Sequence, residues 1–206
     1  MKVKMCGLRR IEDIEYANEV RPDYIGFIFA DTWRKISIET AVKLKKALNP
    51  EIKAVGVFVN ESMNVMVQIA KEVPLDIIQL HGDETEEVIT GLREKTGLEI
   101  WKAARVRAAE DIEKVQKLSA DKILLDSFSE DAYGGTGKLM NVSLIEQASI
   151  EKPFFVAGGL TIENTGNIIK RIDPYGIDIS SGIETEKKKD LDKMKKIMEI
   201  TGGKNE

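Results

Sequence analysis

Short, mainly apolar runs alternate along this chain with longer stretches in which apolar residues recur every three or four positions. The apolar runs predict parallel strands that are covered on both faces, and the periodic stretches predict amphipathic helices. One such stretch places Met63, Met66, Val67 and Ala70 at i, i+3, i+4 and i+7, on a single helix face. The predicted strands are 3–7, 23–29, 54–59, 76–80, 99–103, 122–126, 153–157 and 176–180.

A predicted helix follows each predicted strand, which gives eight strand–helix units. Asp83 is the expected N-cap of the helix that contains Val88 and Leu92. Strict alternation implies a parallel sheet, and eight units favour an α/β fold of the closed (β/α)8 type, the TIM barrel. No linker divides the units, so residues 1–206 are expected to form a single catalytic domain. The alternative is an open doubly wound sheet, which lacks support because no Gly-x-Gly-x-x-Gly turn follows the first strand.

Composition and charge narrow the class of protein. The net charge is −4, and acidic and basic residues are interleaved, so the sequence offers no basic stripe for nucleic acid and no polybasic patch for a membrane. No apolar run approaches the roughly 20 residues of a membrane span, and no signal-peptide pattern is present. We therefore expect a cytoplasmic protein. The single cysteine and single histidine exclude an intrachain disulfide and argue against a metal site.

In a barrel of this type the chemistry takes place where the strands end. The predicted ends carry Cys6, the loop around Arg34, Asn60, His81, Arg105, Asp126, Gly158, Gly159, Ser180, Ser181 and Gly182. Each reactive side chain also has an ordinary interpretation. Cys6 alone would be a small core residue, Asp126 is as well suited to capping a helix as to acid–base work, and His81 alone would be structural.

Glycines and serines at the ends of the seventh and eighth predicted strands indicate a phosphate site. Glycine lets backbone N–H groups approach an anion closely, and these two loops are the usual phosphate site of such barrels. The alternative is that these glycines only permit tight turns. The glycine run at 134–138 does not form a Walker motif, because Leu139 stands where Ser or Thr is required. We expect it to cover the substrate as a mobile loop.

Two further positions suggest electrostatic roles. Arg34 suits a carboxylate ligand and the neighbouring Trp33 suits stacking on an aromatic one, although a surface arginine is the simpler interpretation. Lys4 shares strand parity with Cys6 and should point into the barrel. A buried ammonium needs a partner, and Asp178 on the adjacent eighth strand is the candidate, in what we interpret as an interior ion pair.

Together these segments resemble the phosphoribosylanthranilate isomerase family of tryptophan biosynthesis. The matching segments, in the family's order, are 4–7, 26–29, 55–60, 79–82, 124–126, 134–137, 157–160 and 178–184. The chain has Thr32-Trp33-Arg34 where the family usually has Ser-Pro-Arg, and Met-Asn-Val at 140–142 where it often has Phe-Asp-Trp. The first difference concerns the shape of the arginine loop, and the second concerns the packing of the cover.

The resemblance implies an Amadori rearrangement, without a cofactor or metal, of N-(5-phosphoribosyl)anthranilate to 1-(2-carboxyphenylamino)-1-deoxyribulose 5-phosphate. It implies that Asp126 is the general acid, that Cys6 is the general base and that Arg34 holds the anthranilate carboxylate. The phosphate would lie on the loops at Gly159 and Ser181. We also expect substrate contacts from His81, Gly135, Gly158, Asp178, Ser180 and Gly182, and a monomer or homodimer.

These roles make a physical demand on the site. A free thiol titrates near 8.5 and a free Asp near 3.9, so at pH 7 a thiolate base and a protonated acid are both minority forms. The site is expected to lower the pKa of Cys6, through Lys4 or a backbone dipole, and to raise that of Asp126 by desolvation.

Two other functions remain open from the residues. Another sugar-phosphate isomerase or epimerase would commonly use paired carboxylates, which Cys6 argues against. A phosphate-binding barrel without catalysis would leave the clustering of Cys6, Arg34 and Asp126 unexplained.

Overall fold

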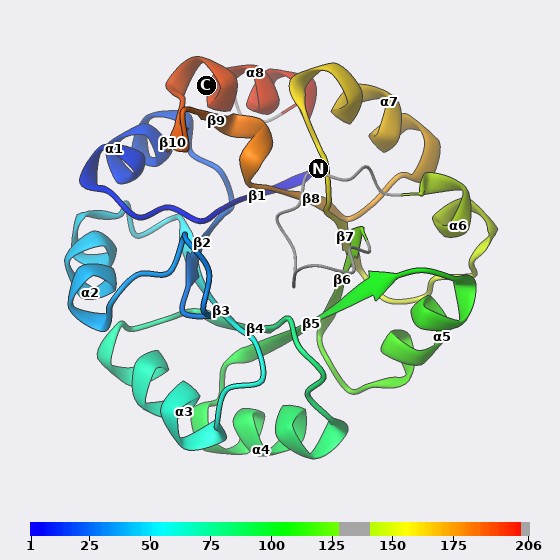
Figure 1. Cartoon of the computed structure of the whole chain (residues 1–206), viewed down its shortest axis with the longest axis horizontal. Helices are drawn as coiled ribbons and strands as arrows, with labels where there is room; N and C mark the ends of the chain where they lie inside the picture. The colour runs from blue at the N-terminus through cyan, green and yellow to red at the C-terminus, as the bar shows by residue number, and fades with distance from the viewer. Residues whose placement is uncertain (128–140, 203–206) are drawn as a thin grey trace.

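A computed structural model describes residues 1–127 and 141–202 and shows a closed barrel of eight parallel strands inside a ring of helices (Figure 1). The strands are β1 (Lys2–Cys6), β2 (Tyr24–Ile28), β3 (Lys53–Phe58), β4 (Ile77–Leu80), β5 (Glu99–Val106), β6 (Lys122–Ser127), β7 (Phe154–Val156) and β8 (Gly176–Ile179). Each strand pairs with the next, and β1 pairs with β8, which closes the sheet. The predicted (β/α)8 barrel is thus confirmed, and the open sheet is excluded.

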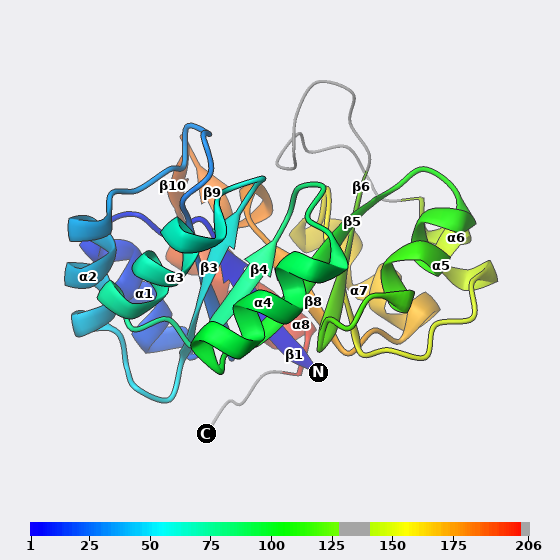
Figure 2. The ribbon, with the colours of Figure 1, turned by 90° about the horizontal axis from the view of Figure 1, so that it is seen from below.

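The helices alternate with the strands along the chain. They are α1 (Ile11–Val20), α2 (Ile38–Ala47), α3 (Met63–Glu72), α4 (Glu86–Thr96), α5 (Ala109–Lys117), α6 (Val142–Gln147), α7 (Ile162–Ile172) and α8 (Leu191–Ile200). A short 3₁₀ helix, η1 (Ser181–Ile183), and a hairpin of β9 (Glu184–Thr185) and β10 (Lys188–Lys189) follow β8. Figure 2 shows this hairpin and the β2–α2 loop at the same end of the barrel, away from the chain's N-terminus.

Aromatic side chains fill the barrel interior below its functional end. The rings of Trp101 and Phe155 stack with centroids 4.6 Å apart, and Tyr24 meets Trp101 edge-on at 5.0 Å. Burying each such ring stabilises the fold by roughly 1.5–3 kcal/mol. This part of the interior is therefore filled with apolar side chains, and polar groups lie nearer the carboxyl ends of the strands.

Local capping explains where several helices begin, and in one case it corrects the expectation from sequence. Ser37 precedes α2, and its Oγ accepts a hydrogen bond from the backbone N–H of Thr40. The sequence favours Asp83 as the cap of α4, which is wrong: the helix begins three residues later and Thr85 is its N-cap. The backbone N–H of Asp83 instead donates to Asn60 Oδ1 at 2.7 Å, which joins the loops after β3 and β4.

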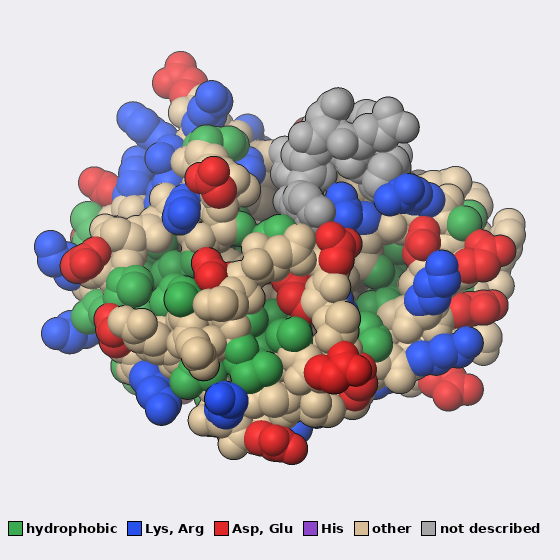
Figure 3. All heavy atoms as spheres, turned by 60° about the horizontal axis from the view of Figure 1, so that its bottom comes forward, with side chains coloured by type: hydrophobic (Ala, Val, Ile, Leu, Met, Phe, Trp, Pro, Cys, Tyr) green, Lys and Arg blue, Asp and Glu red, His purple; other side chains and the backbone are tan. Residues whose placement is uncertain are grey.

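The outer surface carries charged side chains of both signs, and Lys and Arg gather at the upper left in Figure 3. Within residues 1–127 and 141–202 no helix has the length and apolar character to cross a membrane. In the same residues no group of three or more His, Cys, Asp and Glu side chains is arranged to hold a metal ion.

Candidate active site

Asp126, the second-last residue of β6, is the first member of a line of three polar side chains. Its Oδ1 accepts the backbone N–H of Ser127 at 2.7 Å, and its Oδ2 lies 3.1 Å from Nε2 of His81. Nδ1 of His81 lies 3.0 Å from Nε2 of Gln79. His81 thus bridges Gln79 and Asp126 through its two ring nitrogens, and its tautomer decides which of them donates. His81, predicted as a substrate contact, thus supports Asp126 directly.

Gly158 leaves the space that Asp126 occupies. A Cβ at Gly158 would lie 2.6 Å from Oδ1 of Asp126 and 2.3 Å from Oγ of Ser127, and its φ of +86° is left-handed. The neighbouring Gly159 is also left-handed, at +65°. A Cβ at Gly182 would lie 2.0 Å from the carbonyl oxygen of Leu160, so the loops after β7 and β8 touch there. Gly158 therefore has a packing role at the carboxylate, while its predicted phosphate role stays a prediction.

Replacing Gly158 with alanine is expected to lower kcat about 10- to 100-fold, because a displacement of about 1 Å at a reacting group costs rates of that order. Steady-state kinetics together with thermal unfolding would measure it. Gly97→Ala is the matched control: Gly97 has a similar φ of +67°, but a Cβ added there would meet no atom within 4 Å. Both variants should lose stability through backbone strain. An equal loss of kcat in both would contradict a specific effect on Asp126.

Lys4 and Asp178 form the predicted interior ion pair. Lys4 Nζ lies 2.9 Å from both carboxylate oxygens of Asp178, and the Lys4 side chain is fully buried. The two residues are paired in the β1–β8 register. Burial lowers the pKa of Lys4, but the charges of Asp178 and Cys6 raise it above its ordinary value overall. Lys4 is therefore a fixed positive charge inside the barrel.

Cys6 ends β1 as a buried free thiol, and its Sγ packs on Gly26 of the neighbouring strand β2. Burial raises the pKa of this thiol, Lys4 lowers it, Asp178 raises it and Lys189 lowers it; the result is above the ordinary value. The expected lowering of the Cys6 pKa is thus not found in this structure. Lys4 acts in the expected direction, but burial is the larger effect and Asp178 opposes it.

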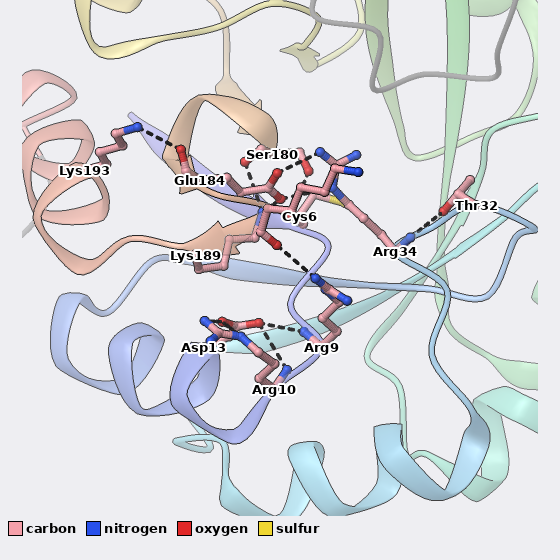
Figure 4. A network of polar contacts seen from close by, with 11 residues as sticks. Cys6, Arg9, Arg10, Asp13, Thr32, Arg34, Ser180, Glu184, Lys189 and Lys193 are labelled. Carbon is pink, nitrogen blue, oxygen red and sulfur yellow. Dashed lines mark hydrogen bonds and ion pairs between the residues drawn. The ribbon is translucent and has the colours of Figure 1, made fainter.

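Arg34 lies in the β2–α2 loop, and Glu184 holds one edge of its guanidinium (Figure 4). Its Nε and Nη2 donate to the two carboxylate oxygens at 3.0 and 2.9 Å. Lys189 Nζ donates to Glu184 at 2.8 Å and to the carbonyl oxygen of Ser180 at 3.0 Å. Burial raises the pKa of Glu184, but Arg34 and Lys189 bring it below its ordinary value. The bidentate pair leaves the other guanidinium edge, Nη1–Nη2, for a second carboxylate.

Trp33, predicted to stack on an aromatic ligand, is 44% exposed beside Arg34. The Cζ of Arg34 lies 4.1 Å from the centroid of a ring of the Trp33 indole, and the Cζ of Arg9 lies 4.9 Å from a Trp33 ring centroid. Cation–π contact therefore steadies both guanidinium groups at this end of the barrel.

The structure brings most of the predicted site residues to one end of the barrel. Cys6, Asp126, His81, Asp178, Arg34, Gly158, Gly159, Ser180, Ser181 and Gly182 stand on or after the carboxyl ends of the strands. The Oγ of Ser180 donates to the carbonyl oxygen of Cys6 at 3.0 Å. Gly135 and the rest of the predicted cover, 134–138, lie outside the described residues.

Sequence reasoning missed Gln79, Glu184 and Lys189 as parts of the site. Glu184 and Lys189 belong to the charged run 184–190, which is typical of a solvent-exposed loop. The sequence of this run does not indicate which members are buried; the β9–β10 hairpin decides it, and there Lys189 is buried while Lys188 is exposed. Gln79 shares strand parity with the interior residue Ile77, a placement that the alternation along β4 would have shown.

Comparisons with known proteins agree with this arrangement. Residues 3–200 match the sequence profile of a family described as N-(5'phosphoribosyl)anthranilate (PRA) isomerase. A protein from Thermoanaerobacter pseudethanolicus named N-(5'-phosphoribosyl)anthranilate isomerase is 45% identical over 203 residues, which cover 98% of each chain. A crystal structure of phosphoribosyl anthranilate isomerase from Thermotoga maritima has a TM-score of 0.87 at 32% identity and covers 98% of this chain and 99% of that one.

A further solved structure that this chain resembles contains a ligand. That structure is phosphoribosyl anthranilate isomerase in complex with reduced 1-(o-carboxyphenylamino)-1-deoxyribulose 5-phosphate. Its TM-score is 0.82 at 32% identity, and the match covers 98% of this chain and 99% of that chain.

Proposed function

Because the chain belongs to the N-(5'-phosphoribosyl)anthranilate isomerase family, we propose that Asp126 is its general acid and Cys6 its general base. The protein isomerises N-(5-phosphoribosyl)anthranilate to 1-(2-carboxyphenylamino)-1-deoxyribulose 5-phosphate in tryptophan biosynthesis. The observation that supports the two roles is a buried carboxylate at the end of β6 and a buried thiol at the end of β1, at the same end of one barrel.

The reaction needs one proton donor and one acceptor. Asp126 gives its proton to the ring oxygen as the C1–O bond breaks, and the nitrogen lone pair forms a C1=N iminium. The Cys6 thiolate then takes the proton from C2, and the electrons of that C–H bond form C1=C2 and neutralise the nitrogen. The resulting enaminol becomes the aminoketone when its hydroxyl loses a proton and C1 gains one. Acid and base are different groups, so each can be tested separately.

Recognition of the two anionic ends of the substrate falls to different loops. Arg34 would take the anthranilate carboxylate on its Nη1–Nη2 edge, because Glu184 already holds the Nε–Nη2 edge. The backbone at Gly159 and Ser181 would take the phosphate, because Gly159 is left-handed, the loops after β7 and β8 meet at Gly182 and Leu160, and glycine-rich loops let backbone N–H groups approach an anion. His81, Gly158, Asp178, Ser180, Gly182 and Gly135 would supply further contacts or support.

Glu184→Gln is expected to raise KM about tenfold and to leave kcat within about threefold of the wild type. The amide keeps the shape of the carboxylate but loses the charge that fixes Arg34, so substrate binding weakens while Asp126 and Cys6 are untouched. Steady-state kinetics would measure both constants. Glu186→Gln, in the exposed turn of the same hairpin, should change neither. An unchanged KM in Glu184→Gln would contradict the role of this pair.

We further propose that residues 1–206 form one catalytic domain that acts in the cytoplasm, as a monomer or homodimer and without nucleic acid as a partner. Loss of the fluorescence of phosphoribosylanthranilate on addition of purified protein tests the activity. Turnover supports the isomerase. Binding of phosphate ligands without turnover would instead indicate a binding barrel, and turnover of a different sugar phosphate alone would indicate another isomerase.

A further inference from the structure

Trp33 stands at the functional end of the barrel with three cationic side chains around its indole. The Cζ of Arg34 lies 4.1 Å from an indole ring centroid, the Cζ of Arg9 lies 4.9 Å from one, and the Nζ of Lys187 lies 5.4 Å from one. All three lie within the roughly 6 Å at which an aromatic face attracts a cation. They come from the loop after β1, the loop after β2 and the turn between β9 and β10. The indole thus gathers positive charge from segments that are far apart in the sequence.

The three cations differ in how the protein holds them. Glu184 pairs with one edge of the Arg34 guanidinium. Nη2 of Arg9 donates to the backbone carbonyl oxygen of Lys187 at 2.9 Å. Within the described ranges 1–127 and 141–202, neither of these two outer side chains forms an ion pair with a carboxylate. Arg9 is half-buried and Lys187 is exposed, so both charges are accessible from solution beside Arg34.

The loops around the indole carry an excess of positive charge. Segments 7–10, 29–37 and 184–190 contain seven Lys and Arg residues and four Asp and Glu residues, although the whole chain has a net charge of −4. Figure 2 shows the hairpin and the β2–α2 loop side by side, and Figure 3 shows Lys and Arg gathered on that side of the molecule. A surface of this kind attracts small anions from solution.

The hairpin turn that carries Lys187 has a strained backbone. Glu186 and Lys187, the two residues between β9 and β10, are both left-handed, with φ of 50° and 61°. Two-residue turns of this kind are usually made with Asn, Asp or Gly, and other residues there strain the chain. The turn itself therefore does not account for a lysine at position 187. The cation that this lysine places over Trp33 does account for it.

The substrate of the proposed reaction complements this charge. It has an aromatic carboxylate at one end and a phosphate at the other. Arg34, the residue proposed to hold the carboxylate, lies over the same indole as the two outer cations. The phosphate is assigned to the loops after β7 and β8. An anion at Arg9 and Lys187 is therefore close to the final position of the carboxylate, and Trp33, which is 44% exposed, offers an apolar surface to the aromatic ring.

We propose that Arg9 and Lys187, gathered on the indole, form an outer anion site that receives the anthranilate carboxylate of the incoming substrate before it reaches Arg34. This inference rests on the proposed function, which supplies the substrate and the role of Arg34. Glu184 keeps the inner cation in place, while the outer cations are available to the arriving ligand. The outer site acts on substrate capture and leaves the acid–base steps alone.

Fluorescence quenching tests the outer site without turnover, because the chain has two tryptophans and Trp101 is fully buried. Quenching therefore reports on Trp33. Arg9→Gln and Lys187→Asn should each lower the ratio of the iodide to the acrylamide quenching constant about two- to fourfold, since one unit charge nearby attracts iodide by that order and acrylamide is neutral. Asn tolerates the left-handed backbone at position 187. Lys71→Gln, in the last turn of α3, makes the same change of charge and should leave the ratio as in the wild type.

The dependence of kcat/KM on ionic strength tests substrate capture. At about 0.01 M salt, where charges act over about 30 Å, Arg9→Gln and Lys187→Asn should each lower kcat/KM about 3- to 10-fold. At about 1 M salt, where that length is about 3 Å, both variants should come within about 1.5-fold of the wild type. Arg9→Lys keeps the charge and should retain most of the wild-type salt dependence. Glu186→Gln removes a negative charge from the same turn, so at low salt it should raise kcat/KM, and near 0.15 M salt it should have no measurable effect.

A purely structural cluster would give a different result. The loss of kcat/KM would then persist at high salt, and the iodide-to-acrylamide ratio would not change; either outcome would overturn the proposal. Benzoate and inorganic phosphate distinguish the two ends of the substrate. Benzoate should protect Trp33 from iodide at the lower concentration, and better protection by phosphate would overturn the assignment to the carboxylate. A wild type without turnover would overturn the proposed function, whereas a wild type that turns over substrate without the iodide effect would overturn this inference alone.

Discussion

Asp126→Asn is expected to lower kcat about a thousandfold, within the range that a positioned general acid contributes, and to change KM less than about threefold. The amide has nearly the shape of the carboxylate, and its oxygen still accepts the backbone N–H of Ser127 and packs against Gly158. It has no acidic proton for the ring oxygen, so the substrate binds but the sugar ring opens slowly. Single-turnover kinetics would show the loss in the chemical step.

Asp121→Asn provides the control at the other end of the same strand. Asp121 precedes β6, where it pairs with Arg93 and accepts the backbone N–H of Ile100. Losing its charge should lower the melting temperature slightly and leave kcat unchanged. Near-normal turnover by Asp126→Asn, or an equal loss in the two variants, would refute the assignment of Asp126 as the acid.

The fold was predictable because the signal for it is repeated. Every strand shows a short apolar run and every helix a periodic one, so an error at any single element does not alter the topology. Errors occurred at boundaries, where one contact decides the result. Asn60 takes the backbone N–H of Asp83 and delays the start of α4, and β5 continues to Val106 instead of ending at 103. Those contacts come from loops that are distant in the sequence.

The site was predictable as a set of strand ends and less so as a network of charges. The Lys4–Asp178 pair followed from strand parity and barrel closure. The direction of the Cys6 pKa did not, because it depends on how much burial outweighs one nearby cation, which only the packed structure determines. Glu184 and Lys189 were missed since a charged run gives no indication of which members are buried. Gln79 was missed because its contact with Nδ1 of His81 depends on how the side chains pack inside the barrel.

Cys6→Ser is the second substitution with a large expected effect, again about a thousandfold in kcat with little change in KM. A serine hydroxyl is a far weaker acid than a thiol, so the variant has no anion to take the C2 proton, although it fits the space beside Gly26. Alanine at position 6 should be no worse. If Cys6→Ser keeps most of its turnover, the base is another group.

The thiolate itself can be followed, because Cys6 is the only cysteine of the chain. Burial raises the pKa of this thiol, so the rate of its alkylation by iodoacetamide should still increase with pH above the ordinary thiol range near 8.5. Lys189 is one of the two cations that oppose this rise. Lys189→Met should therefore move the midpoint of alkylation to higher pH and lower kcat/KM at pH 7 by the corresponding loss of thiolate.

Lys188→Met separates this effect from a general loss of positive charge. Lys188 is the exposed neighbour of Lys189 on β10, so its removal changes the net charge equally but leaves the interior of the barrel alone. Its alkylation midpoint should match that of the wild type. A midpoint at or below the ordinary thiol range in the wild type would mean that burial does not dominate at Cys6. The thiolate of Cys6 would then be common at neutral pH even without substrate to stabilise it.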